Sequence, residues 1–281
     1  MSKSLEVEQA EPAGKKFLSG TVQLVLFLLV MLLLRTFIAI PYWIPSASMK
    51  PSLLVGDFML VNKMAYGYGP GSCPSLSLLG LRSEELCSFL QDDGKRVFGA
   101  EPERGDIIVF RHRASNVPYI KRVIGLPGDR VRMIDGQVEL NGTMLPQADA
   151  GVFEEPYLPQ GSKRSVPSCS NEVFRLSAET VCKKDLAFET LPNGRSYGVL
   201  DISPSSRDNT GVYTVPANNY FVMGDNRDNS TDSRAQGLMD PGFIESGSII
   251  GRAERVVFSW GGDAFWKVWD WRFDRFLHPL D

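Results

Sequence analysis

Two serines separated by one alanine, Ser46-Ala47-Ser48, lie shortly after the one long apolar run of this sequence. A serine in this position can act on a substrate that is itself held in a membrane. A serine hydroxyl is a weak nucleophile, however, and needs a nearby base. The segment therefore predicts nucleophilic attack by serine, provided that the rest of the chain supplies that base.

Histidine, the usual base, is scarce, and we interpret His112 and His278 as structural or surface residues. Lysine is the alternative, because burial in an apolar site can lower its pKa by several units. Lys121 lies among strand-forming residues in segment 117–125, where alternation lets its side chain point inward. Taken alone, the pattern favours an ordinary exposed lysine, since lysine is rarely buried.

The composition excludes several classes of protein. The chain has 281 residues, of which 43% are hydrophobic and 22% charged, as in a globular protein with a sizeable core. Its net charge is −3, and no lysine and arginine cluster or helix-turn-helix pattern indicates nucleic acid as a partner. The two scattered histidines and four cysteines do not have zinc-ligand spacing. We therefore predict no nucleic-acid partner, no metal and no cofactor.

The apolar run is long enough to cross a membrane. Residues 17–34 carry no charge, and an extension past Arg35 to Ile40 reaches the roughly 20 residues that span a bilayer. We predict a cytoplasmic tail over residues 1–16 and a single transmembrane anchor over residues 17–40. A cleavable signal peptide is the competing interpretation. It is weaker because no small-x-small site directly follows the apolar run.

The cysteines indicate on which side of the membrane the bulk of the chain lies. All four follow the anchor in two close pairs, Cys73 with Cys87 and Cys169 with Cys182. Four cysteines permit three pairings, and these two close the shortest loops. Spaced pairs favour disulfides in an oxidising compartment, with four reduced cysteines in a cytosolic domain as the alternative. We therefore predict that residues 41–281 lie outside the cytoplasm.

Short β-like segments dominate the remainder of the sequence. We predict strands over residues 56–63, 105–110, 119–125, 220–223 and 248–260, and a hairpin over residues 130–145 with its turn at Asp135-Gly136. No long amphipathic helix interrupts them, which favours a mainly β fold. We expect an antiparallel, barrel-like catalytic core over residues 41–131 and 216–281. A smaller β subdomain over residues 132–215 is inserted into it.

The end of the chain is rich in aromatic residues. Four of the five tryptophans lie in residues 260–271, and Trp266, Trp269, Phe273 and Phe276 would share one face of a helix. Two interpretations stay open. This aromatic helix rests on the membrane interface, or it packs back onto the barrel.

Four segments together carry a family resemblance. They are Ser46-Ala47-Ser48-Met49, residues 56–63, residues 104–106 with 119–129, and residues 224–234, in this order. With them the chain resembles bacterial type I signal peptidase (leader peptidase), a membrane-anchored serine peptidase that removes signal peptides. The resemblance spans residues 41–131 and 220–260. Ala47 stands where many members carry glycine, a departure that leaves the reacting groups intact.

The resemblance implies a Ser-Lys dyad. Ser48 resembles the family's nucleophile and Lys121 its general base. Ser46 matches the residue whose hydroxyl, together with the Ser48 amide, stabilises the oxyanion of the tetrahedral intermediate. The implied mechanism passes through an acyl-enzyme that Lys121 then hydrolyses by activating a water molecule.

Residues of the 224–234 segment complete the implied site. Ser230 matches the hydroxyl that orients the Lys121 amine, and Asp232 and Arg234 resemble an ion pair that holds the loop. We interpret Asp225 and Asn229 only as turn-forming residues of a polar loop.

The resemblance also implies the substrate and the location. Signal peptides end in a small-x-small pattern, which calls for shallow apolar pockets. Four residues beside the reacting groups are candidates to line these pockets: Ile44, Pro45, Tyr119 and Ile120. The expected partners are preproteins with signal peptides and membrane lipid, close to the secretion translocon of the inner (plasma) membrane.

Two alternative functions remain. One is a non-catalytic anchored scaffold of the same fold, which the presence of all the reacting residues disfavours. The other is a self-cleaving Ser-Lys repressor of related fold, which the anchor and the lack of a DNA-binding segment disfavour.

Overall fold

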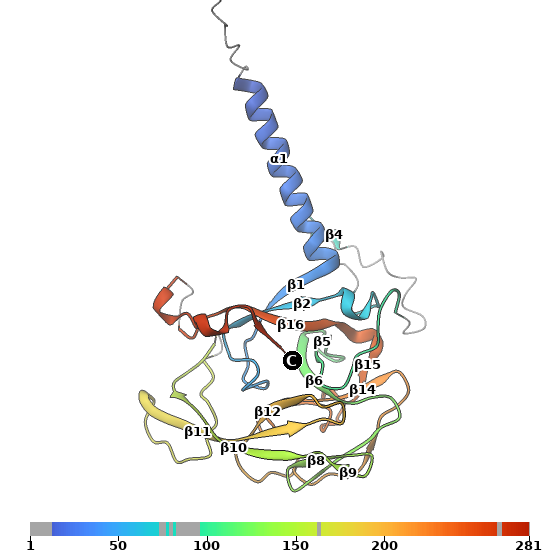
Figure 1. Cartoon of the computed structure of the whole chain (residues 1–281), viewed down its shortest axis with the longest axis vertical. Coiled ribbons are helices and arrows are strands. Elements are labelled where there is room, and N and C mark those ends of the chain that lie inside the picture. The colour runs from blue at the N-terminus through green and yellow to red at the C-terminus, as the bar shows by residue number, and fades with distance from the viewer. Residues whose placement is uncertain are drawn as a thin grey trace, which may run out of the picture.

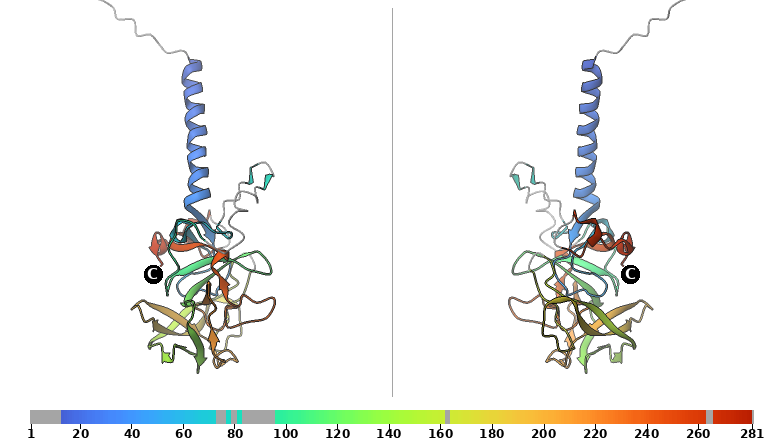
Figure 2. Two further views of the ribbon diagram at one scale, coloured as in Figure 1. Left: turned by 90° about the vertical axis from the view of Figure 1, so that its right-hand side faces the viewer. Right: turned by 90° about the vertical axis from the view of Figure 1, so that its left-hand side faces the viewer.

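A long N-terminal helix projects from a β-rich body (Figure 1 and Figure 2). The structure, a computed structural model, describes residues 13–72, 77–78, 81–82, 96–161, 164–262 and 266–280. Helix α1 covers Ala13–Leu33, and a short π-helical turn continues it over Leu34–Ile38. The segment Gly20–Ile38 has a mean hydropathy of 2.3 and is only 6% buried, so it is long and apolar enough to cross a membrane.

The main sheet has eight antiparallel strands. Its order is β1-β2-β16-β5-β6-β14-β15, with β17 paired to β16. The strands are β1 (Ala39–Trp43), β2 (Asp57–Asn62), β5 (Ile107–Arg111), β6 (Pro118–Gly125), β14 (Asn219–Met223), β15 (Ile244–Glu245), β16 (Ile249–Ser259) and β17 (His278–Pro279). The five single strands predicted from the sequence all lie in this sheet, and the mainly β, antiparallel fold is confirmed.

Strand β1 was not predicted. Its residues continue the apolar run of the anchor, and the expected anchor ended at Ile40, inside this strand. Pro41 also argues against a central strand. Because β1 pairs only with β2 at the end of the sheet, an edge position accommodates this proline.

Two smaller sheets occupy the part of the chain where the insertion was expected, in the lower half of Figure 1. One contains β7 (Arg130–Ile134), β8 (Gln137–Leu140), β9 (Thr143–Met144) and β13 (Tyr213–Thr214). The other contains β10 (Gln147–Tyr157), β11 (Ser177–Thr190) and β12 (Ser196–Asp201). The predicted hairpin is β7–β8. Asp135 and Gly136 both have positive φ in its two-residue turn, as a type I′ turn requires.

The remaining elements are short. Strands β3 (Ser77–Leu78) and β4 (Leu81–Arg82) pair with each other. The 3₁₀ turns are η2 (Met64–Tyr66), η4 (Ser246–Ser248), η5 (Val268–Asp270) and η6 (Phe273–Arg275).

The aromatic C-terminal segment does not form the expected helix. In its described residues it contains only the turns η5 and η6 and the short strand β17. Apart from the bonds within its short turns, its backbone bonds to β16: the Arg272 amide donates to the Ser259 carbonyl and the Leu280 amide to the Glu254 carbonyl. This pairing with β16 holds the segment in a largely extended course.

Some aromatic side chains of this segment pack on the body, as one of the two open interpretations expected, and others stay exposed, as the membrane-interface interpretation requires. The rings of Trp271 and Phe276 pack on Phe258 at centroid distances of 4.8 and 5.2 Å. Trp266 and Trp269 remain 69% and 76% exposed. Part of the segment therefore packs on the body, while its two most exposed rings face largely toward solvent.

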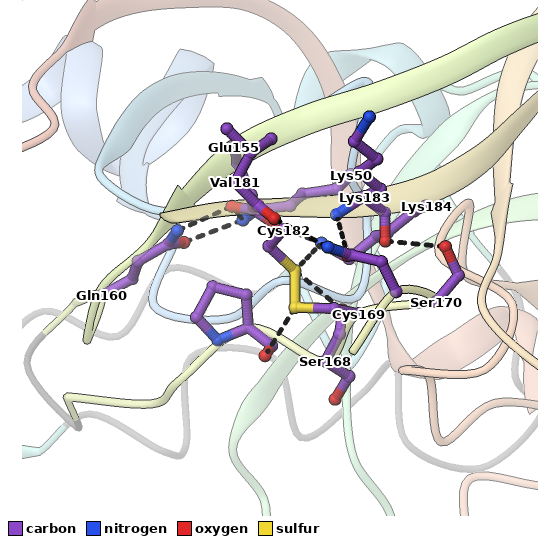
Figure 3. The surroundings of a disulfide bond; sticks show 12 residues. Lys50, Glu155, Gln160, Ser168, Cys169, Ser170, Val181, Cys182, Lys183 and Lys184 are labelled. Carbon is purple, nitrogen blue, oxygen red and sulfur yellow. Dashed lines mark hydrogen bonds and ion pairs between the residues drawn. A yellow bond between two sulfur atoms is a disulfide. The ribbon is translucent and has the colours of Figure 1, made fainter. Parts of the chain in front are cut away.

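One predicted disulfide is present. Cys169 and Cys182 are bonded, with their Cα atoms 5.2 Å apart, and the bond fixes the start of β11 to the loop before it (Figure 3). Cys73 and Cys87 lie outside the described residues.

Asp57 joins the start of β2 to the C-terminal segment. Its side chain is fully buried and accepts hydrogen bonds from Ser259 Oγ (2.6 Å), Arg275 Nη2 (2.6 Å) and the Leu54 amide (2.8 Å). We expect Asp57→Asn to lower the free energy of unfolding by about 3–5 kcal/mol, because it leaves a buried guanidinium unpaired. Denaturant unfolding of the detergent-solubilised chain measures this loss.

The exposed neighbour of Arg275 provides the control. Asp274→Asn makes the same chemical change at an exposed position of the C-terminal segment, where we expect an effect within about 0.5 kcal/mol. Equal effects of the two substitutions would contradict the anchoring role of Asp57.

Candidate active site

Ser48 lies in a tight loop that follows β1. The Ile44 amide still bonds to the Asp57 carbonyl at 2.9 Å, after which the chain turns away from the sheet. Met49 and Leu53 anchor the loop because both side chains are fully buried in the core below β1 and β2. Ser48 itself is 8% exposed.

The loop is also held by Asn226. Its backbone N–H donates to the Ser48 carbonyl at 3.1 Å, and its side-chain Nδ2 donates to the Ala47 carbonyl at 3.0 Å. The predicted motif segment 224–234 therefore packs directly beneath Ser48.

Lys121 reaches the loop from β6. Within the β5–β6 pair it lies opposite Ile108, and its side chain points inward with 4% exposure. Its Nζ donates hydrogen bonds to Ser48 Oγ at 2.9 Å and to the Ile120 carbonyl at 2.8 Å. The fold thus joins two side chains that are 73 positions apart in the sequence.

Burial sets the protonation of this lysine. Loss of water around the ammonium group lowers the pKa of Lys121 to about 8, while the carboxylates of Asp232 and Asp225 act in the opposite direction. Among the described residues no carboxylate forms an ion pair with the Lys121 amine. A substantial neutral fraction near physiological pH follows.

Two buried arginine–carboxylate pairs flank the lysine. Arg234 binds Asp232 through two contacts of 2.9 Å, and Asp232 also accepts the Gly224 amide at 3.0 Å. The adjacent Arg122 binds Asp225 in the same two-point manner, again at 2.9 Å. The pairs satisfy the acidic groups locally, which leaves the Lys121 amine free to bond to Ser48.

The interpretation of Asp225 as a turn-forming residue is therefore wrong. Its side chain is 1% exposed and forms the buried pair with Arg122, whose guanidinium also lies 4.1 Å from the centre of the Tyr197 ring. One feature of the sequence indicates that Arg122 does not share the environment of Lys121. Arg122 follows Lys121 in the strand, so the two side chains must point to opposite faces of the sheet.

Ser230 lies close to the reacting loop but does not make the expected hydrogen bond. Its Oγ is buried and has no hydrogen-bond partner among the described residues. A Cβ atom added at Gly224 would lie 2.3 Å from Ser230 Oγ and 2.5 Å from the Ser48 carbonyl oxygen, so only glycine fits between them. The two hydrogen bonds of the Lys121 amine go to Ser48 and to the Ile120 carbonyl instead.

A cavity of about 320 Å³ opens beside Ser48 and Lys121. All four residues proposed from the sequence to line it do so: Ile44, Pro45, Tyr119 and Ile120. Ser46, which is exposed, lies at the same cavity. The sequence analysis missed further lining residues: Tyr42, Trp43, Met59, Val109, Val117, Pro118, Asn229 and Thr231. Recognition of β1 as a strand would have found Tyr42, because it shares a face with Ile44.

In the parts of the chain that the structure describes, no group of three or more His, Cys, Asp or Glu side chains could hold a metal ion.

Comparison with known proteins assigns the family. The family model described as "Signal peptidase, peptidase S26" matches residues 18–260. The chain belongs to this signal peptidase family. Family membership makes it a serine peptidase, and therefore a hydrolase, as the resemblance predicted.

Named relatives agree with this assignment. The chain is 36% identical to a signal peptidase I of Rickettsia typhi over 239 residues, which cover 82% of this chain and 76% of the relative. It is 35% identical to the signal peptidase I of Rickettsia prowazekii, with the same coverage. A crystal structure of a signal peptidase I from Enterococcus faecalis is 27% identical, covers 54% of this chain and 97% of its own, and has a TM-score of 0.28.

The buried setting of Lys121 gives a direct spectroscopic prediction. We expect its amine to titrate near pH 8, well below the ordinary lysine value of 10.5, because burial disfavours the charged form. NMR of the chain with labelled lysine side chains, assigned with Lys121→Met, measures this value. A midpoint above pH 10 would contradict the desolvated site.

Proposed function

We propose that this chain is a membrane-anchored serine endopeptidase that removes N-terminal signal peptides from exported preproteins. Ser48 is the nucleophile and Lys121 the general base. The observation that supports this most directly is the 2.9 Å contact between Lys121 Nζ and Ser48 Oγ in a buried site. It supplies the activating base that an isolated serine lacks.

The reaction follows from this contact. Neutral Lys121 removes the hydroxyl proton as Ser48 Oγ attacks the scissile carbonyl, and the resulting ammonium group then protonates the leaving amine. The acyl-enzyme ester that remains is hydrolysed when Lys121 takes a proton from a water molecule. The amine thus cycles between its two protonation states, which a pKa of about 8 permits near neutral pH.

The oxyanion requires separate hydrogen-bond donors. Among the described residues nothing accepts a hydrogen bond from the Ser48 amide, so it is available to a substrate oxygen. The Ser46 hydroxyl, exposed at the same cavity, is the second donor. Donors that are fixed before the reaction stabilise the developing charge more effectively than water does.

The cavity matches the end of a signal peptide. A small-x-small motif places two small side chains on one face of an extended strand. Ile44, Tyr119 and Ile120 supply an apolar wall of the cavity beside Ser48. Such walls accept alanine-sized groups and exclude larger ones.

The apolar helix and the disulfide support the proposed location. Helix α1 with its π-helical continuation anchors the chain once in the inner (plasma) membrane, next to membrane lipid. The Cys169–Cys182 bond favours an oxidising compartment for residues 41–281. We place the catalytic core, with its insertion over residues 132–215, on the extracytoplasmic side, close to the translocon that delivers its preprotein substrates.

Substitution of the dyad is the decisive test. We expect Ser48→Ala and Lys121→Met each to abolish cleavage of a model preprotein in a gel-shift assay, because one removes the nucleophile and the other its base. Retention of cleavage by either variant would contradict the mechanism. A wild type that is itself inactive would favour the non-catalytic scaffold instead.

Lys63 provides a matched control. Burial also lowers its pKa to about 8, but its Nζ donates to the Thr36 carbonyl at 2.7 Å rather than to a serine. We therefore expect Lys63→Met to keep the dyad intact and to retain cleavage.

The proposed preference for a small residue predicts substrate selectivity. Replacement of alanine by leucine at the substrate position immediately before the cleaved bond should lower kcat/KM at least about tenfold, because the added isopropyl group would contact the wall formed by Ile44, Tyr119 and Ile120. The same replacement one position earlier, where the side chain points away from the cavity, should have little effect. Equal losses at both positions would show that the cavity does not select the small residue.

A further inference from the structure

Lys50 belongs to a buried ionic cluster that the sequence did not reveal. It follows Ser48 by two positions, and its side chain is 3% exposed. Its Nζ donates hydrogen bonds to the Glu155 carboxylate on β10 and, at 2.8 Å, to Gln160 Oε1 (Figure 3). Gln160 Nε2 in turn donates to Glu155 Oε2 at 2.6 Å. We call Lys50, Glu155 and Gln160 the loop clamp.

Glu155 has a second partner within its own sheet. Lys184 of β11, with a side chain that is 1% exposed, pairs with the other carboxylate oxygen. Glu155 also lies directly opposite Cys182 in the β10–β11 pair, next to the disulfide. One buried carboxylate thus binds two lysines, of which only Lys50 belongs to the loop that carries Ser48.

The clamp fixes a different side of the loop from Asn226. Asn226 holds the carbonyls of Ala47 and Ser48, whereas the Lys50 amide closes the turn by donating to the Ala47 carbonyl at 3.2 Å and its side chain extends to β10. A buried ion pair adds little stability over an apolar replacement, but it constrains geometry through its directional hydrogen bonds. Displacement of a reacting atom by about 1 Å can cost a hundredfold in rate.

We propose that Glu155 and Gln160 are positioning residues for the reaction. Acting through Lys50, they fix the backbone of residues 47–50 and hence the place of Ser48 Oγ relative to Lys121. The inserted sheet of β10, β11 and β12 is then part of the machinery that aligns the dyad. This inference rests on the proposed function.

Two lysine substitutions separate positioning from general stability. Lys50→Met and Lys184→Met each remove one buried lysine from Glu155, and each leaves a single one-to-one ion pair. A merely structural cluster would make both variants equally impaired. The loop clamp predicts that only Lys50→Met affects the reaction, since Lys184 contacts Glu155 without contacting the loop.

The reaction rate must be expressed per folded active site, so that a loss of folded protein is not mistaken for a slower reaction. Titration of the full-length chain in detergent with a serine-directed acylating inhibitor gives the active fraction from its amplitude and the rate per site from its time course. We expect Lys50→Met to lower the rate per site and kcat at least about tenfold, with KM for a model preprotein changed less than about twofold. Lys184→Met should keep the wild-type rate per site.

The pH–rate profile adds a second readout, because its midpoint does not depend on the fraction of the protein that is folded. The groups that set the pKa of Lys121 (Asp232, Asp225 and Arg234) are untouched in these variants. We therefore expect the plateau of the pH–rate profile to fall in Lys50→Met while its midpoint stays in place. A shifted midpoint would overturn positioning as the cause.

A second pair of variants tests the carboxylate itself. Glu155→Gln should reproduce the loss seen in Lys50→Met. Glu154→Gln, at the next position of β10, removes a half-exposed carboxylate that pairs with Lys183 at 3.2 Å, and should behave as the wild type. Should Lys50→Met or Glu155→Gln give no folded sites, Gln160→Leu removes the 2.8 Å acceptor of Lys50 and the 2.6 Å donor to Glu155 but leaves the Lys50–Glu155 ion pair, and it should slow acylation severalfold. A wild-type rate in Gln160→Leu would then overturn the inference.

The outcomes distinguish this inference from the proposed function. Cleavage by Ser48→Ala would overturn both. Equal rates per site in Lys50→Met and Lys184→Met, with Ser48→Ala inactive, would overturn the loop clamp alone.

Discussion

The contact between the Lys121 amine and the Ser48 hydroxyl is the constraint on which the rest of the structure depends. Lysine acts as a base only when it loses its proton, and water strongly favours the protonated form. The site therefore has to exclude water, which burial between β6 and the Ser48 loop achieves. It also has to keep carboxylates away from the amine, because a direct ion pair would raise the pKa again.

Acidic groups are nevertheless close, and their pairing explains how the site tolerates them. Asp232 and Asp225 each accept two hydrogen bonds from an arginine, Arg234 and Arg122 respectively. Each buried charge is thus neutralised by its own partner. These pairs fix the segment beneath Ser48 and leave the lysine mostly under the influence of its desolvation. A rigid polar frame and a neutral amine coexist for this reason.

The segments that meet at the dyad come from every part of the fold. The apolar helix α1 leads through its π-helical continuation into β1, the strand that precedes the Ser48 loop. The inserted sheet contacts that loop through Glu155, and the C-terminal segment reaches it through Arg275, which binds Asp57 and the Ser52 carbonyl. In the proposed function, this connection brings Ser48 near the membrane surface, where a substrate that is itself held in the membrane could reach it.

Much of this arrangement was predictable from the sequence. Apolar runs bounded by turn residues identified five strands of the main sheet and the hairpin at Asp135-Gly136, and apolar length identified the helix, since these are local properties. Four ordered motifs identified the family and singled out Ser48 and Lys121. Only the tertiary structure showed the buried pairing of Asp225, the clamp on Lys50, the extended course of the aromatic tail and the lowered pKa of Lys121. Each of these depends on partners distant in the sequence, whose burial and charge no local pattern encodes.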